Sequence, residues 1–340
     1  MAGQPRQGYD AVIAALTEAK TALLFLHINA DGDSVGSTLA LAQALERRGA
    51  TCWLTYGDRF PEPYRFLPGA DRLQPWQTIA PDLRFDLAIL PDCSDVDRVG
   101  AAVKLLAQAA QVVNIDHHPS NRGFGDVRWL DPTRSCVGEM VLEIIDGLGV
   151  PIDAPIATCL YTAIMTDTGS FAFESTTART HRYAARLLEH GAKPHVIARE
   201  VYGKMSLRSL RLLGEVLAGL EVSADGRVAW IRISRELRAR HGAGPHDCEG
   251  FVNYPRNLAG VEIALAFYEE DDGSVRVAFR STQYADVSQL AAEFGGGGHR
   301  RAAGCRHRGP LEQAVREIVA RASSYVAEPS VLSGAARGEG

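Results

Sequence analysis

Positive charge is not in excess in this sequence of 340 residues: 36 Lys and Arg stand against 41 Asp and Glu, a formal net charge of -5. This balance excludes a broadly basic surface that coats long nucleic acids. Also missing are an uninterrupted apolar run of roughly 18 residues, which a membrane span needs, and a basic start followed by an apolar stretch. We therefore expect a soluble protein without a membrane partner.

Cysteine is scarce and follows no metal-binding pattern. The six cysteines have no CxxC spacing, and most lie in apolar runs, where a reduced thiol packs as a small hydrophobic group. A reducing cytoplasm is therefore the predicted location. The cysteines are Cys52, Cys93, Cys136, Cys159, Cys248 and Cys305.

Hydrophobic residues make up 46% of the chain, which is enough for two domains with sizeable cores. We predict a first domain over residues 1–192, a helical linker over 193–215 and a second domain over 216–327. The small and polar residues 328–340 predict a disordered tail.

The first domain alternates helical patterns with short apolar runs. A helix over 34–49 has Ser34 as its expected N-cap. Nearly continuous apolar runs are typical of parallel strands that are buried on both faces. We therefore predict an α/β fold with a doubly wound, mainly parallel sheet, whose strands include 21–27, 51–57, 85–92 and 111–118.

The second domain has a different pattern. A strand is predicted at 227–234, and two strands joined by the turn EDDGS are predicted within 260–281. A capped helix over 286–295 runs into the glycine-rich stretch GGGGHRRAAG. This pattern predicts a smaller α+β domain, with a cleft between the two domains.

Charged residues gather where the predicted strands end. His27 follows one strand, Asp92 follows another, and Asp116 to His118 end a third. Because the carboxyl ends of parallel strands line one crevice, we expect these side chains to lie close together. Each also has an ordinary explanation: Asp92 could cap the next helix, and adjacent histidines can be accidental.

Three further aspartates are expected at the same crevice. Asp31 and Asp33 lie two apart in a looped segment, so their side chains can project to one side, although DGD is also good turn sequence. Asp167 ends a strongly apolar helical run and has no Lys or Arg near it in the sequence. Converging carboxylates repel one another unless cations are bound, and two divalent cations resolve that conflict. Oxygen ligands with one or two imidazoles suit Mn²⁺, with Mg²⁺, Co²⁺ or Zn²⁺ as alternatives.

The ordered segments HINADGDSVGS, LPDCSD, NIDHHPSN and TDTGSF resemble the DHH phosphoesterase family, named for the triplet that is Asp116-His117-His118 here. The segment FGGGGHRRAAG resembles the glycine-rich signature of the type-one DHH-associated C-terminal domain. The resemblance covers nearly the whole chain. Length and layout are most similar to the bifunctional oligoribonuclease and pAp phosphatase branch, the NrnA-type nano-RNases.

This resemblance implies a binuclear metal site in which Asp92 bridges the two ions. His118 would contact the scissile phosphate, and Asp116 would orient an imidazole. Two ions roughly 3.5–4 Å apart can activate water for attack on phosphorus. The implied ligands are His27, Asp31 and Asp92 for one ion, and Asp33, Asp92, His117 and Asp167 for the other.

The second domain would grip the substrate. Backbone N–H groups at Gly296, Gly297 and Gly298 can face an anion, with a flexible linker as the alternative interpretation of these glycines. Further phosphate contacts would come from Arg280, Ser281 and His299. The segment FVNYPRN contains Phe251, Tyr254 and Arg256, and our hypothesis is that these side chains stack on a base or contact a phosphate. The alternative is that they are core residues.

The implied activity is metal-dependent hydrolysis of short single-stranded RNA to mononucleotides, and of 3'-phosphoadenosine 5'-phosphate (pAp) to AMP. A homodimer is compatible with this activity. The nearest alternative is a phosphodiesterase for cyclic di-AMP or pApA, because the same residues would serve. Further alternatives are a single-strand DNA exonuclease of the RecJ type, an inorganic pyrophosphatase and a non-catalytic nucleotide sensor.

Overall fold

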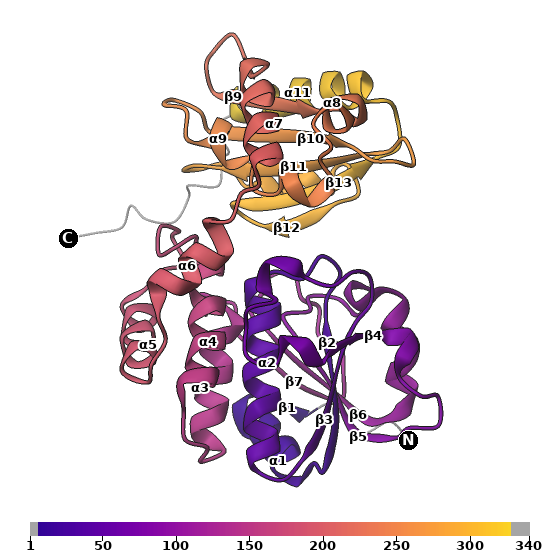
Figure 1. Cartoon of the computed structure of the whole chain (residues 1–340), viewed down its shortest axis with the longest axis vertical. Helices are drawn as coiled ribbons and strands as arrows, with labels where there is room; N and C mark the ends of the chain where they lie inside the picture. Colours follow the sequence, from indigo (N-terminus) through magenta and orange to yellow (C-terminus); the bar gives the residue numbers. More distant parts are fainter. Residues whose placement is uncertain (1–5, 328–340) are drawn as a thin grey trace, which may run out of the picture. The chain divides into compact units, whose positions relative to one another are not determined.

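The structure is a computed structural model that describes residues 6–327 of the chain. The expected disordered tail, 328–340, lies outside the described residues. After Lys204 the chain divides into two compact units, and each consists of a sheet with helices packed against it (Figure 1). Among the described residues, no helix is both long enough and apolar enough to cross a membrane.

The first unit contains a seven-stranded sheet in the order β1-β7-β6-β5-β2-β3-β4, and every strand pair is parallel. The six strands from β2 onward follow the 3-2-1-4-5-6 order of doubly wound sheets, so the predicted α/β class is confirmed. The strands are β1 (Arg6–Gln7), β2 (Thr21–Leu26), β3 (Thr51–Tyr56), β4 (Leu73–Pro75), β5 (Phe85–Pro91), β6 (Ala109–Asp116) and β7 (Val127–Leu130).

The winding direction of this sheet reverses between β2 and β5. From β2 the chain winds outward through β3 and β4, and it then returns to the other side of β2 to form β5. In such sheets, ligands bind beyond the carboxyl ends of the strands at the reversal point. His27 directly follows β2 and Asp92 directly follows β5, so both lie at this point.

Helices cover both faces of the sheet, which explains the continuous apolar strands. In β2, Leu24 and Leu26 pack on the side of α1 to α4, whereas Leu23 and Phe25 pack on the side of η4. The helical segments of this unit are α1 (Tyr9–Glu18), α2 (Gly32–Arg47), η1 (Glu62–Tyr64), η2 (Ala70–Arg72), η3 (Trp76–Thr78), η4 (Val96–Gln108), α3 (Val137–Gly147), α4 (Ala154–Asp167), α5 (Ala178–Glu189) and α6 (Pro194–Tyr202).

Two glycines let α2 and α4 approach each other closely. A Cβ atom on Gly36 would lie 2.3 Å from the Cys159 carbonyl oxygen, and one on Gly32 would lie 2.3 Å from Thr166 Oγ1. No larger residue fits these positions without moving one of the helices. The close packing brings the start of α2 against the end of α4, where Asp167 lies.

Substituting Gly36→Ala is therefore expected to destabilise the first unit by about 1–3 kcal/mol, because the obstructing atom belongs to the α4 backbone. Gly214→Ala in α7 is the matched control: its Cβ would meet nothing within 4 Å. There, better helix propensity should stabilise by about 0.5–1 kcal/mol. Urea denaturation followed by circular dichroism measures both changes, and a shift of the same sign in both variants would contradict this account of the packing.

The second unit contains a six-stranded mixed sheet in the order β12-β13-β11-β10-β9-β8. The predicted hairpin is present as antiparallel β10 and β11, and the parallel neighbour of β10 is β9. The strands are β8 (Glu221–Val222), β9 (Val228–Ile233), β10 (Ile263–Glu269), β11 (Val275–Ser281), β12 (Gly297–His299) and β13 (Ala302–His307).

Separate apolar clusters cover the two faces of this second sheet, which confirms the predicted α+β class. The glycine-rich stretch forms the edge strand β12 instead of a flexible linker. The helical segments are α7 (Leu207–Ala218), α8 (Arg235–Arg240), η5 (Pro245–Cys248), α9 (Asn253–Arg256), α10 (Val287–Ala292) and α11 (Leu311–Ala327).

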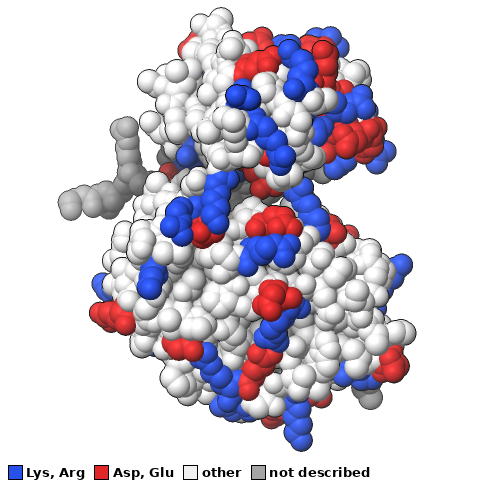
Figure 2. Space-filling model, in the orientation of Figure 1, with Lys and Arg blue, Asp and Glu red and all other residues white. Residues whose placement is uncertain are grey.

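Surface charge follows the composition. On the face drawn in Figure 2, basic and acidic side chains are interspersed and no broad basic field is seen. Several exposed charged side chains of the described residues are paired, such as Arg186 with Asp146 at 2.6 Å and Arg321 with Glu293 at 2.6 Å. Such exposed pairs contribute little to stability.

Candidate metal centre

Asp31 is the N-cap of helix α2, and its side chain is partly exposed to solvent. Its Oδ1 accepts the N–H groups of Asp33 and Ser34, each at 3.1 Å. The expectation that Ser34 is the N-cap is therefore wrong: the helix begins at Gly32. The looped geometry expected for Asp31 and Asp33 is also wrong, because Asp33 lies in the first helical turn. The side chain of Asp31 is 51% exposed, whereas that of Asp33 is 1% exposed.

Asp33 is held by the start of helix α3. Its carboxylate accepts the N–H groups of Val137 at 2.7 Å and Gly138 at 2.8 Å, together with the Ser37 hydroxyl at 2.9 Å. Burial raises the pKa of Asp33 to about 6, although His117 and the two N–H groups act in the opposite direction. Sequence reasoning missed this contact because the donors lie more than a hundred positions away.

Asp92 lies at the centre of the cluster. Its backbone is left-handed, with φ 58°, an uncommon conformation for a residue other than glycine. Oδ2 lies 3.2 Å from His27 Nε2, whereas Oδ1 lies 3.7 Å from His117 Nε2. Burial, followed by the charges of Asp33 and Asp31, raises the pKa of Asp92 well above its ordinary range.

Two imidazoles present Nε2 to these carboxylates. His27 Nδ1 donates to the Ile28 carbonyl at 2.9 Å, and His117 Nδ1 donates to the Arg134 carbonyl at 3.2 Å. A ring that donates through Nδ1 keeps a lone pair on Nε2, and this is the usual arrangement of a metal-binding histidine. Both Nε2 atoms face carboxylate oxygens: that of His27 faces Asp92, and that of His117 faces Asp167 at 3.4 Å.

The third imidazole, His118, is oriented by Asp116. Its Nδ1 donates to Asp116 Oδ1 at 2.8 Å, and Asn121 Nδ2 donates to Asp116 Oδ2 at 2.7 Å. Burial alone would raise the pKa of Asp116, but these hydrogen bonds outweigh it and lower the pKa. Asn121 also donates to the Cys93 carbonyl at 3.1 Å, so it ties β6 to the residue that follows Asp92. Sequence reasoning gave Asn121 no role, although it ends the segment NIDHHPSN.

Asp167 approaches from the end of helix α4. Its side chain is 15% exposed, and its Oδ2 faces His117 Nε2. Burial raises the pKa of Asp167 well above its ordinary range; His117 opposes this shift, and Asp33 adds to it. The helix predicted over this apolar run is present, and it places the charge at its end.

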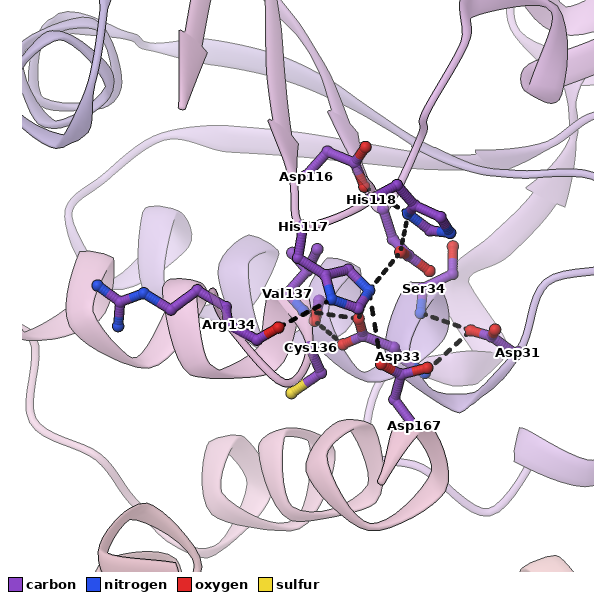
Figure 3. Close-up of polar contacts among 12 residues, drawn as sticks. Asp31, Asp33, Ser34, Asp116, His117, His118, Arg134, Cys136, Val137 and Asp167 are labelled. Carbon is purple, nitrogen blue, oxygen red and sulfur yellow. Dashed lines mark hydrogen bonds and ion pairs between the residues drawn. The ribbon is translucent and has the colours of Figure 1, made fainter. Parts of the chain in front are cut away.

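The donor atoms form three overlapping groups, and within each group they lie within 4.8 Å of one another. Figure 3 shows the labelled side chains converging from separate elements. The groups are His27 with Asp31 and Asp92, Asp33 with His117 and Asp167, and Asp92 with His117 and His118.

These residues fit divalent cations. Asp92 Oδ1 is buried and accepts no hydrogen bond within residues 6–327. In the same described range, no Lys or Arg forms an ion pair with Asp33, Asp92, Asp116 or Asp167. Buried carboxylates without counter-ions are unfavourable unless cations bind or protons are taken up, and carboxylate oxygen with imidazole nitrogen is a suitable donor set for a transition metal.

The second unit carries the other predicted contacts. Arg280 Nη1 donates to the carbonyl of the preceding residue, Phe279, at 2.9 Å. Ser281 is buried, and its hydroxyl lies 3.4 Å from the Arg300 carbonyl. Arg256 ends helix α9 and is half-buried. His299 belongs to strand β12, but its side chain lies outside the described part of the structure.

Gly296, which precedes the edge strand β12, and Gly297 and Gly298 within it have different surroundings. A Cβ on Gly296 would lie 2.1 Å from the Gly304 carbonyl oxygen, and one on Gly298 would lie 2.6 Å from that of Ala302. A larger residue at Gly296 or Gly298 would therefore clash with the neighbouring strand β13, so packing within the sheet explains these two glycines. A Cβ on Gly297 would meet nothing within 4 Å, so the backbone there is open to close approach.

The aromatic residues expected to contact a base separate into two kinds. Phe251 is 1% exposed and packs in the core of the second unit, so a base contact there is excluded. Tyr254 is 42% exposed and remains available for such a contact. The sequence could not separate them, because both lie in the same short segment.

Comparison with known proteins gives two family matches. Residues 21–164 match the model of the DHH family, N-terminal domain, and residues 227–328 match that of the DHHA1 domain. The first match contains every residue of the three donor groups except Asp167, which lies three positions beyond its end.

Relatives of similar length are found in several bacteria. The chain is 32% identical over 299 residues to the bifunctional oligoribonuclease and PAP phosphatase NrnA of Thermus thermophilus, with 86% of each chain covered. It is 27% identical to the protein of the same name from Bacillus subtilis, with 86% of this chain and 91% of that one covered. A solved structure of an exopolyphosphatase-related protein from Bacteroides fragilis matches with a TM-score of 0.86 at 27% identity, covering 93% of this chain and 95% of the other.

Proposed function

The chain belongs to the DHH family, and we propose that it is a metal-dependent phosphoesterase that hydrolyses short oligoribonucleotides to mononucleotides and pAp to AMP. The observation that carries this proposal is the cluster of buried carboxylates and imidazoles at the reversal point of the parallel sheet. The relatives named as oligoribonucleases and PAP phosphatases cover most of the chain and supply the substrate class.

We assign the metal ligands as two sets that share Asp92. Bound divalent cations would polarise phosphate oxygens and lower the pKa of water at neutral pH. Mn²⁺ is the proposed ion, because carboxylates combined with imidazoles suit it better than Ca²⁺ or a sulfur-bound metal. The first set is His27, Asp31 and Asp92, and the second is Asp33, Asp92, His117 and Asp167.

His118 has a different role in this proposal. Because its Nδ1 donates to Asp116, the ring presents Nε2 to the crevice in a fixed orientation. Burial is the main cause that lowers the pKa of His118, and a proton taken up at Nε2 would make both ring nitrogens donors. In that form the ring would contact the scissile phosphate and pass the Nε2 proton to the leaving oxygen, and a proton of the attacking water would replace it. Asp116 and Asn121 keep the ring in position.

The second unit, proposed as the substrate-binding domain over 216–327, would hold a terminal nucleotide phosphate. Within residues 6–327, no carboxylate pairs with Arg280. Burial lowers the pKa of Arg280, and the nearby Arg256 and Arg276 act in the same direction. The guanidinium of Arg280, which has no carboxylate partner among the described residues, favours an anionic ligand, and the open backbone at Gly297 would add N–H groups.

A substrate panel tests the proposal. Initial rates are measured with Mn²⁺ and Mg²⁺ on pAp, on RNA of two to ten nucleotides, on pApA, on cyclic di-AMP and on inorganic polyphosphate. We expect pAp and the shortest RNAs to react fastest and polyphosphate to react slowly. Faster hydrolysis of cyclic di-AMP would favour the alternative phosphodiesterase, and no turnover of any ester would refute the proposal.

A further inference from the structure

Arg98 brings a cation to the metal centre that sequence reasoning did not identify. It lies in the first turn of η4, where its N–H donates to the Asp95 carbonyl at 3.1 Å and its carbonyl accepts the Ile28 N–H at 2.6 Å. These contacts fix its backbone beside the end of β2. Its Nη2 lies 3.0 Å from Nδ1 and 3.4 Å from Nε2 of His27.

Within residues 6–327, the guanidinium of Arg98 has no anionic partner. No carboxylate of the described residues pairs with it, and its side-chain contacts there are those with His27. His27 Nδ1 already donates to the Ile28 carbonyl, so it has no lone pair to offer. A guanidinium carries five N–H donors in a planar fork, and most of them are therefore available to a ligand.

The position of Arg98 relative to the proposed metal ligands follows from its contact with His27. The imidazole that Arg98 Nη2 approaches to 3.0 Å has its Nε2 atom 3.2 Å from Asp92 Oδ2 and 3.8 Å from Asp31 Oδ1. The guanidinium therefore lies beside the first ligand set, where a phosphate bound at that set would meet it.

We propose that Arg98 is a catalytic residue that binds the non-bridging oxygens of the phosphoryl group undergoing hydrolysis. This inference rests on the proposed function. The guanidinium fork matches two phosphate oxygens, and its charge stabilises the negative charge on them in the transition state. During the reaction the water oxygen bonds to phosphorus, the ester P–O bond breaks, and a proton from water reaches the leaving oxygen. Arg98 keeps all its protons.

Arg98 could instead serve only to position the His27 imidazole, and that role predicts a different change in metal affinity when Arg98 is removed. If Arg98 only positioned the imidazole, its removal would loosen that ligand and weaken the metal. If Arg98 binds phosphate, its positive charge opposes the cations nearby, and removing it leaves metal affinity unchanged or higher. The sign of the change in Mn²⁺ affinity therefore separates the two roles.

The test uses the full chain with Arg98→Ala and Arg98→Lys, and Arg84→Ala as the matched control. Arg84 is exposed and directly precedes β5, at the opposite end of that strand from Asp92. Among the described residues, its side chain donates only to the carbonyls of Pro81 and Leu83. For Arg98→Ala we expect kcat/KM for pAp to fall about 100-fold to 1,000-fold, with partial recovery in added guanidinium. Calorimetric titration of inorganic phosphate into the Mn²⁺-loaded protein should give a Kd raised at least about 10-fold, with circular dichroism unchanged.

Two outcomes would overturn the inference: an unchanged phosphate Kd in Arg98→Ala, or Mn²⁺ binding weakened in parallel with activity. Turnover of pAp by the wild-type protein tests the proposed function separately. The phosphate titration reports on Arg98 whether or not pAp is the substrate, so the two failures are distinguishable.

Discussion

Asp92→Asn is expected to lower kcat for pAp and for short RNA by at least about 1,000-fold, because the carboxylate that both proposed ligand sets share loses its charge and one of its oxygens. Its two oxygens face different imidazoles: Oδ2 faces His27, and Oδ1 faces His117. Asparagine keeps the shape but not the charge, so both ions should bind more weakly. Steady-state rates and metal content by atomic emission measure the two effects.

The same substitution is not expected to unfold the metal-free protein. The pKa of Asp92 is raised by burial and then by Asp33 and Asp31, which means that its charge is unfavourable there. A neutral amide at this position should leave the metal-free protein at least as stable as wild type. Asp82→Asn, at an exposed position before β5, is the control for loss of one carboxylate. Near-normal turnover of Asp92→Asn with two bound ions would refute the ligand assignment.

The location of the metal centre could be predicted from the sequence, because the carboxyl ends of parallel strands lie along one edge of the sheet. Apolar runs that end in His27, Asp92 and Asp116 must bring these residues to one edge of the sheet, whatever the loops do. The order of the strands then places His27 and Asp92 on neighbouring strands at the reversal point. This part of the site depends on local periodicity and one topological rule, and both can be read from the chain.

Contacts between distant segments could not be predicted in this way. Asp31, Asp33 and Ser34 can all cap a helix, and tertiary packing decides in favour of Asp31. Asp33 is free to bind the start of α3 because it lies inside the helix, and nothing near Asp33 in sequence reveals Val137 as its partner. Arg98 could not be predicted as a site residue either, because a single arginine in a polar segment matches no sequence motif.

Metal removal is expected to destabilise the first unit strongly near neutral pH and weakly in mild acid. In the folded, metal-free protein the pKa of Asp33 is raised from 3.8 to about 6. The folded state therefore binds this proton more tightly than the unfolded chain, and stability falls as pH rises from about 4 through about 6. That shift corresponds to about 3 kcal/mol, and the raised pKa values of Asp92 and Asp167 extend the loss to higher pH.

Bound cations reverse this loss, because they stabilise the ionised carboxylates. At a free concentration of 100 times Kd, each ion adds about 2.7 kcal/mol, so two ions should raise the Tm of a unit of this size by roughly 10–20 °C at pH 7.5. At pH 5 the carboxylates compete with protons for the ions, and the difference should shrink to a few degrees. Thermal unfolding with Mn²⁺ or with chelator at both pH values measures it. Hydrogen exchange in β10 and β11 of the second unit is the internal control, and a chelator effect that does not change with pH would show that buried carboxylates are not its origin.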